Sequence, residues 1–135
     1  MSTDQSTDSP QTSDPGTGPL VLLVQPDGTA TTERMPATGT PAQDRAQLKF
    51  INDAIGGYFT TIGDGVWIAL VNEDGERLML PPNTTADLLA RALGFRFRPG
   101  DELLGPVIFT SRKGTELGDV TPAVLEFARQ AGVIA

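Results

Sequence analysis

The chain has 135 residues, of which 39% are hydrophobic, and its formal net charge is -7 at pH 7. This length and composition fit a single domain with one modest core. Because the sequence has no cysteine and no histidine, disulfides, thiolate chemistry, the usual zinc ligands and the usual general base are excluded.

The first 18 residues are almost all Ser, Thr, Asp, Pro, Gly and Gln. Such a segment buries too little apolar surface to offset about 1–2 kcal/mol of backbone entropy per residue. We therefore predict a disordered tail over residues 1–18 and a single domain over residues 19–135. The tail is most simply a solubilising segment; the alternative is a segment that folds on a partner.

The domain should open with a hairpin, followed by a helix. Asp27-Gly28 is a strong hairpin signal between a β-rich run, residues 20–25, and a Thr-rich edge segment, residues 29–35. A capping box with a proline in the first helical position then opens residues 40–55, where apolar residues recur at helical spacing. Gly56-Gly57 suits the end of this helix, since glycine tolerates the left-handed conformation.

The rest of the chain should add four strands and two helices. Residues 66–71 are apolar at every position, which is typical of a central strand covered on both faces. The resulting order, ββαβββαβα, favours an α+β fold: a mainly antiparallel or mixed sheet of about six strands, with two or three helices on one face. The predicted segments are strands at residues 58–62, 66–71, 76–80 and 103–110 and helices at residues 84–93 and 121–132.

Several short segments together resemble a known family. They are Gly-Gly-Tyr after a helix, an acidic-Gly turn, a Leu-Pro-x-Asn segment and a late Gly before an apolar strand, in residues 55–58, 72–78, 80–86 and 104–107. With the opening residues 21–28, this pattern resembles the domain-of-unknown-function family 3846, small proteins of actinobacteria, their phages and mobile elements. The resemblance spans most of residues 20–110.

The resemblance implies a small cytosolic accessory protein, and a phage or plasmid context would favour binding to a host or defence component. It implies no activity that can be carried over residue by residue. The Arg-rich stretch at residues 91–98 and the helix at residues 121–132 depart from the family pattern.

One candidate contact site combines Gly56, Gly57, Tyr58 and Asn83. A hydroxyl and an amide beside exposed glycine backbone could contact a small ligand or a peptide. The simpler interpretation is that Asn83 caps the following helix and Tyr58 packs in its strand. We expect the turn that carries Glu73 and Asp74 to lie at the opposite end of the sheet, as a solvated hairpin tip.

A second candidate site is a basic patch of Arg91, Arg96, Arg98, Arg112 and Lys113, half of all basic residues. At the strand period, Arg96 and Arg98 share one face, which could hold an acidic partner, a phosphate or a nucleic-acid backbone. Phe95 and Phe97 fall on the opposite face, whereas single-stranded nucleic acid favours aromatics beside the arginines. A solvated face is the simpler interpretation.

We therefore predict a non-enzymatic binding or regulatory protein, with no catalytic site, metal site or cofactor. Its partner should be a protein; nucleic acid is not expected, because net negative charge opposes phosphate binding. No apolar run approaches the roughly 18 residues of a membrane helix, so we expect a cytoplasmic location and no membrane. The alternatives are a small-ligand protein or enzyme using Tyr58 and Asn83, and nucleic-acid binding through Arg96 and Arg98. The oligomeric state stays open.

Overall fold

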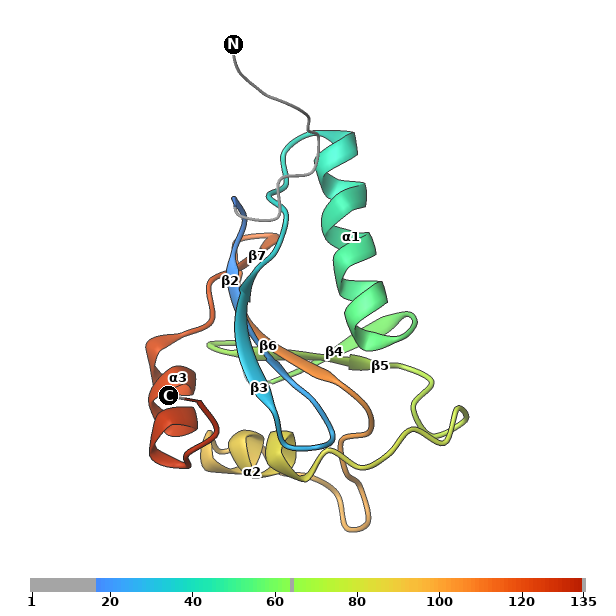
Figure 1. Ribbon diagram of the computed structural model, residues 1–135, viewed down its shortest axis with the longest axis vertical. Helices are drawn as coiled ribbons and strands as arrows, with labels where there is room; N and C mark the ends of the chain where they lie inside the picture. The colour runs from blue at the N-terminus through green and yellow to red at the C-terminus, as the bar shows by residue number, and fades with distance from the viewer. Residues whose placement is uncertain (1–16, 64, 135) are drawn as a thin grey trace.

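The computed structural model describes residues 17–63 and 65–134, which form one six-stranded sheet with three helices (Figure 1). All strand pairs are antiparallel. The predicted α+β fold class is thereby confirmed. Of the predicted tail, residues 1–16 lie outside the described residues, and Gly18 is already buried, with its N–H donating to the carbonyl of Met35 at 2.8 Å.

The sheet has the strand order β3-β2-β6-β5-β4, and β7 pairs with the far end of β6. Hairpins join β2 to β3, β4 to β5 and β6 to β7, and β6 lies between the first two hairpins. The strand bounds are β2 Leu20–Val24, β3 Ala30–Arg34, β4 Phe59–Gly63, β5 Ile68–Asn72, β6 Val107–Lys113 and β7 Glu116–Gly118.

The predicted β2–β3 hairpin forms around Asp27-Gly28. The Asp27 carboxylate accepts from the backbone N–H of Thr29 at 2.9 Å and from its hydroxyl at 2.7 Å. Because these bonds favour the ionised form, they lower the pKa of Asp27. Gly28 has a φ of 92°, which a residue with a side chain rarely adopts. The turn therefore depends on the local residues that predicted it.

The helices are α1 Pro41–Ile55, α2 Thr84–Ala92 and α3 Pro122–Gln130. The predicted capping box of α1 is present: Thr40 Oγ1 accepts from the N–H of Gln43 at 3.1 Å, and the Gln43 side chain accepts from the N–H of Thr40 at 3.1 Å. Gly56 ends α1 with a left-handed φ of 89°. Within the described part of the chain, no helix is both long and apolar enough to cross a bilayer.

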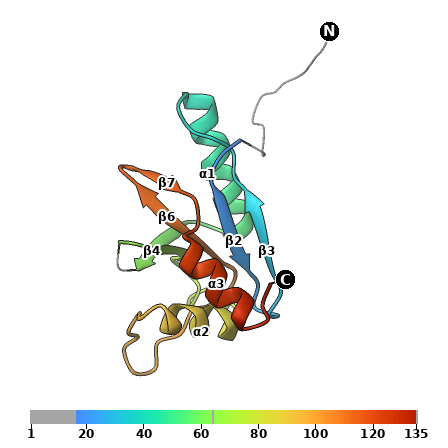
Figure 2. The ribbon, with the colours of Figure 1, turned by 90° about the vertical axis from the view of Figure 1, so that its left-hand side faces the viewer.

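The helices cover both faces of the sheet, whereas the sequence led us to expect them on one face. Val21 and Leu23 pack in a cluster with α1, and Leu22 and Val24 pack on the opposite face with α2 and α3. In Figure 1, α1 and α3 accordingly lie on opposite sides of the sheet, and Figure 2 brings α3 in front, next to α2. Strand β5 is buried along its whole length, as the apolar run predicted, but it begins at Ile68 rather than at Val66, which is 71% exposed.

One predicted strand, residues 76–80, is absent from the sheet. Residues 76–80 form successive turns, because the N–H of Leu78 donates to Asp74 and the N–H of Leu80 donates to Gly75, both at 2.9 Å. These local bonds use the backbone groups that a strand would offer to a neighbour. Residues 95–98, which alternate at the strand period, also lie outside any strand, and β7 is an additional short strand.

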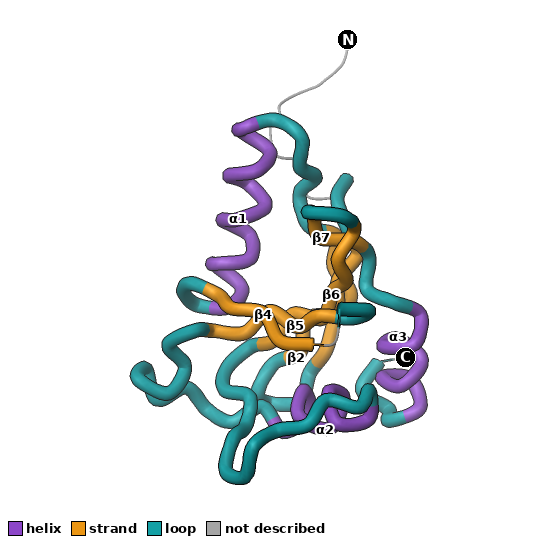
Figure 3. Tube along the Cα trace, turned by 180° about the vertical axis from the view of Figure 1, so that it is seen from behind, coloured by secondary structure: helices purple, strands orange, loops and turns teal. Residues whose placement is uncertain are grey.

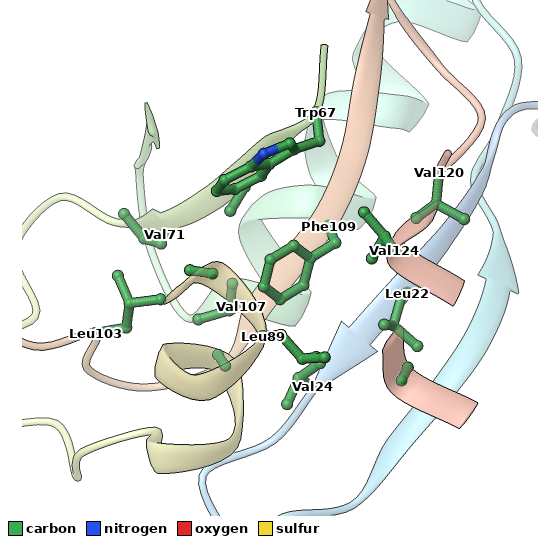
Figure 4. Packing of buried hydrophobic residues seen from close by; sticks show 14 residues of the cluster. Leu22, Val24, Trp67, Val71, Leu89, Leu103, Val107, Phe109, Val120 and Val124 are labelled. Carbon is green, nitrogen blue, oxygen red and sulfur yellow. The ribbon is translucent and has the colours of Figure 1, made fainter. Parts of the chain in front are cut away.

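Phe109 lies at the centre of the larger core cluster (Figure 4). It is fully buried on β6, and its ring centroid lies 6.0 Å from that of Trp67. Phe109→Ala should lower the free energy of unfolding by about 3–5 kcal/mol, since truncation leaves a cavity. Phe127, which is 38% exposed on α3, provides the matched control, with an expected loss of about 1 kcal/mol or less for Phe127→Ala. Equal losses in urea unfolding would contradict this picture of the core.

Candidate functional site

Asn83, one of the four predicted contact residues, is fully buried. Its Nδ2 donates to the carbonyls of Val24 and Gly105, at 2.9 Å each, and its Oδ1 accepts from the N–H of Ala86 at 3.0 Å. As the N-cap of α2, it ties that helix to β2 and to the segment before β6. The simpler interpretation of Asn83 therefore holds, and its amide has no group to offer a ligand.

The other three predicted residues lie together where α1 meets β4. The N–H groups of Gly56 and Gly57 donate to the carbonyl of Asn52, at 2.8 and 3.0 Å. Tyr58 is 72% exposed, and it is not packed in its strand. With Asn52 and Asp53, these residues line an open pocket of about 450 Å³, here called the Tyr58 pocket.

The turn after β5 lies beside the Tyr58 pocket, not at the opposite end of the sheet as expected. Since β4 and β5 are antiparallel, Phe59 at the start of β4 faces Asn72 at the end of β5. The N–H of Glu73 donates to the carbonyl of Tyr58 at 3.0 Å. The expectation was wrong because the start of β4 and the end of β5 lie at the same, open end of the β4–β5 hairpin.

Asn72, which the sequence analysis missed, connects this turn to α1. It is only 8% exposed, and its Nδ2 donates to the carbonyl of Ile55 at 3.3 Å while its Oδ1 accepts from the N–H of Asp74 at 2.8 Å. A Cβ at Gly57 would lie 3.2 Å from Asn72 Nδ2, so a side chain at position 57 would displace the Asn72 amide slightly. The sequence feature that could have identified Asn72 is its place at the first position of a turn, where an Asn side chain often accepts a hydrogen bond from the backbone N–H two residues later.

The acidic residues of this turn form a solvated surface. Asp74 pairs with Arg77 at 3.0 Å, and the hydrogen bond first, then the Coulombic attraction, raises the pKa of Arg77. A groove of about 270 Å³ alongside is lined by Glu73, Glu76 and residues 100–104. Among residues 17–63 and 65–134, no group of three or more acidic side chains is arranged to hold a metal ion.

The predicted basic patch is divided between two ends of the molecule. Arg91, Arg96 and Arg98 lie on the last turn of α2 and in the connection from α2 to β6, whereas Arg112 and Lys113 end β6. That connection and the β6–β7 hairpin occupy opposite ends of the fold in Figures 1 and 3.

The aromatic residues of the connection pack inward. The rings of Phe95 and Phe97 lie 4.9 Å apart, and Phe95 lies 6.1 Å from Trp67. The guanidinium of Arg91 lies 4.4 Å from the centre of the Phe97 ring. The predicted alternation is thus present, with half-buried aromatics and exposed arginines, although the segment is not a strand.

Strand β4 has no second neighbour among residues 17–63 and 65–134, and this free edge begins at the Tyr58 pocket. Tyr58 and Glu73 form a hydrogen-bonded pair, so the antiparallel register makes Thr60 and Ile62 the residues bonded to β5. The backbone groups of Phe59, Thr61 and Gly63 therefore point away from β5, toward the open edge of the sheet.

These features define a small α+β protein with an open antiparallel sheet and a shallow pocket at one edge. The chain belongs to the family described as Domain of unknown function (DUF3846), whose model matches residues 19–131. The resemblance drawn from the sequence motifs is thereby confirmed. No curated protein and no solved structure matches the chain.

The role of Asn83 gives a direct test. Asn83→Ala leaves two buried carbonyls and one buried N–H without their partner, so it should lower the free energy of unfolding by about 3 kcal/mol. Asn83→Asp keeps the acceptor for Ala86 but loses both donors, and should still cost more than about 1 kcal/mol. Urea unfolding followed by circular dichroism measures both. A loss below about 1 kcal/mol for Asn83→Ala would leave the residue free for another role.

Proposed function

We propose that this chain is a non-enzymatic binding protein that captures an extended segment of a protein partner as an additional strand beside β4. The observation that carries the proposal is the chemistry of this edge. Strand β4 has the sequence FTTIG, with no charged residue and no proline, and it ends the sheet. An unprotected edge is a ready template for an incoming strand, which gains main-chain hydrogen bonds.

The opposite edge supports this choice by contrast. Strand β3 carries Glu33 and Arg34, and charged side chains on an edge discourage further pairing. The end of α3 and the residues after it approach the same strand, since Arg129, Val133 and Ile134 line a groove with residues 30–32. The β3 edge is thus disfavoured for further pairing, whereas the β4 edge is open. We therefore expect the partner at β4 rather than at residues 29–35.

The two alternative functions have less support in the geometry. The small-ligand alternative loses Asn83, whose side chain is buried and fully bonded. The nucleic-acid alternative needs a continuous basic surface, but the five basic residues are divided between two ends of the fold. The family resemblance favours a cytoplasmic accessory factor of phage or plasmid origin, and we include that setting in the proposal.

The decisive variant is Thr61→Pro. The N–H of Thr61 points outward, so proline removes an edge donor and puts its ring in the path of an incoming strand without breaking a bond to β5. Thr61→Val is the matched control, because it keeps the backbone N–H and the shape of the side chain. Affinity purification from the native cell should recover a partner with the wild type and with Thr61→Val, and lose at least about tenfold of it with Thr61→Pro.

Unfolding in urea should show that Thr61→Pro remains folded, since proline is accepted on edge strands. Thr60→Pro, in contrast, should destabilise the protein, because the N–H of Thr60 bonds to β5. A partner that binds Thr61→Pro as well as the wild type would exclude strand addition at β4.

A further inference from the structure

We propose that the Tyr58 pocket binds the cationic side chain of a lysine or arginine in the segment that pairs with β4. This inference rests on the proposed function and adds the chemistry that the partner must carry. The pocket lies directly before β4, because Tyr58 precedes Phe59, the first residue of that strand. A segment that continues past the start of β4 therefore passes the pocket.

The electrostatics at the end of α1 favour a positive charge. The C-terminus of a helix carries about half a negative charge, which a cation in the last turn usually offsets. The last turn of α1 has no basic residue, and among the described residues that line the pocket Asp53 is the one charged group. A bound ammonium or guanidinium would supply the missing cation.

Asp53 remains available to a partner although it has an ion pair. Its carboxylate lies 2.6 Å from Lys49 Nζ, one turn earlier on α1, but the two side chains are 65% and 75% exposed. Such exposed pairs are weak, so an incoming cation can share or replace Lys49. Glu73, which is bonded to Tyr58 through its backbone, adds a second exposed carboxylate beside the approach.

Tyr58 provides an aromatic face for the same cation. Tyr58 is largely exposed, and the face of an exposed aromatic ring attracts a cation. Gly56 and Gly57 carry no side chains, so the backbone at the end of α1 stays open to a long aliphatic stem. Ring, carboxylate and uncovered backbone together suit the side chain of lysine or arginine.

The side chain of Asn52 adds an unused acceptor. Its Oδ1 is buried beside the pocket and has no hydrogen-bond partner. A buried acceptor without a donor is costly, and ammonium and guanidinium groups carry several donors. Rotation of the amide toward the pocket would let a bound cation satisfy this oxygen.

The pocket can be tested with a small cation, independently of strand pairing. The full ¹⁵N-labelled chain is titrated with n-butylammonium chloride, and n-butanol and sodium chloride serve as neutral and ionic controls. We expect saturable amide shift changes at Gly56, Gly57 and Tyr58 with butylammonium alone. Equal changes with butanol, or changes with butylammonium that spare these three amides, would overturn the inference and leave strand addition at β4 untouched.

Variants identify the groups responsible. Asp53→Asn and Tyr58→Leu should each weaken butylammonium binding about two- to fivefold, while Tyr58→Phe keeps the aromatic face and the affinity. Glu126→Gln on α3 removes the same charge far along the chain and should have no effect. Unchanged affinity in both Asp53→Asn and Tyr58→Leu would contradict the assignment.

A further experiment tests whether the cation bound in the Tyr58 pocket belongs to the partner. In the affinity purification, Asp53→Asn and Tyr58→Leu should reduce capture of the partner that Thr61→Pro loses. If that partner is captured normally by both variants, the cation is not carried by the paired segment and the inference fails. If butylammonium binds but Thr61→Pro retains the partner, the proposed function fails while the pocket remains.

Discussion

The structure depends on the insertion of β6 between two hairpins. A two-stranded hairpin is marginally stable alone, and β6 joins the β2–β3 and β4–β5 hairpins into one sheet by pairing with β2 and β5. Residues 107–110 of this strand are fully buried, and Phe109 packs one face while Ile108 packs the other. Asn83 holds the entry to β6 by bonding the carbonyl of Gly105. Loss of this pairing would separate the sheet into its hairpins.

The same insertion decides which backbone groups remain available. With β6 at the centre, β3 and β4 become the two edges of the sheet. The chain places charges and its C-terminal residues along β3, and places the end of α1 beside the start of β4. The Tyr58 pocket is adjacent to β4 because Tyr58 directly precedes that strand, and the strand order makes β4 an edge of the sheet.

Local signals in the sequence predicted local structure well. The Asp27-Gly28 hairpin and the Thr40 capping box each depend on atoms within a few residues, so the sequence contains the whole interaction. Residues 20–24 and 66–71 are apolar throughout, which indicates strands covered on both faces. Such runs do not identify which helix covers each face, so the helices were expected on one face and the second helical layer was missed. The candidate site was predictable only where its residues are close in sequence. Gly56 to Tyr58 are neighbours in the chain, whereas the roles of Asn72 and Asn83 depend on hydrogen-bond partners 17 to 59 residues away.

A binding function of this kind suits a chain without imidazole or thiol side chains. In the proposed binding mode, main-chain N–H and C=O groups would supply the contacts at β4, and these groups require no particular side-chain chemistry. Only three β4 residues direct their backbone groups outward, and each hydrogen bond contributes a net of about 0.5–1.5 kcal/mol. Strand pairing alone would accept almost any extended segment with modest affinity. Selectivity must then come from side chains next to the edge, and Tyr58 and Asp53 occupy that position.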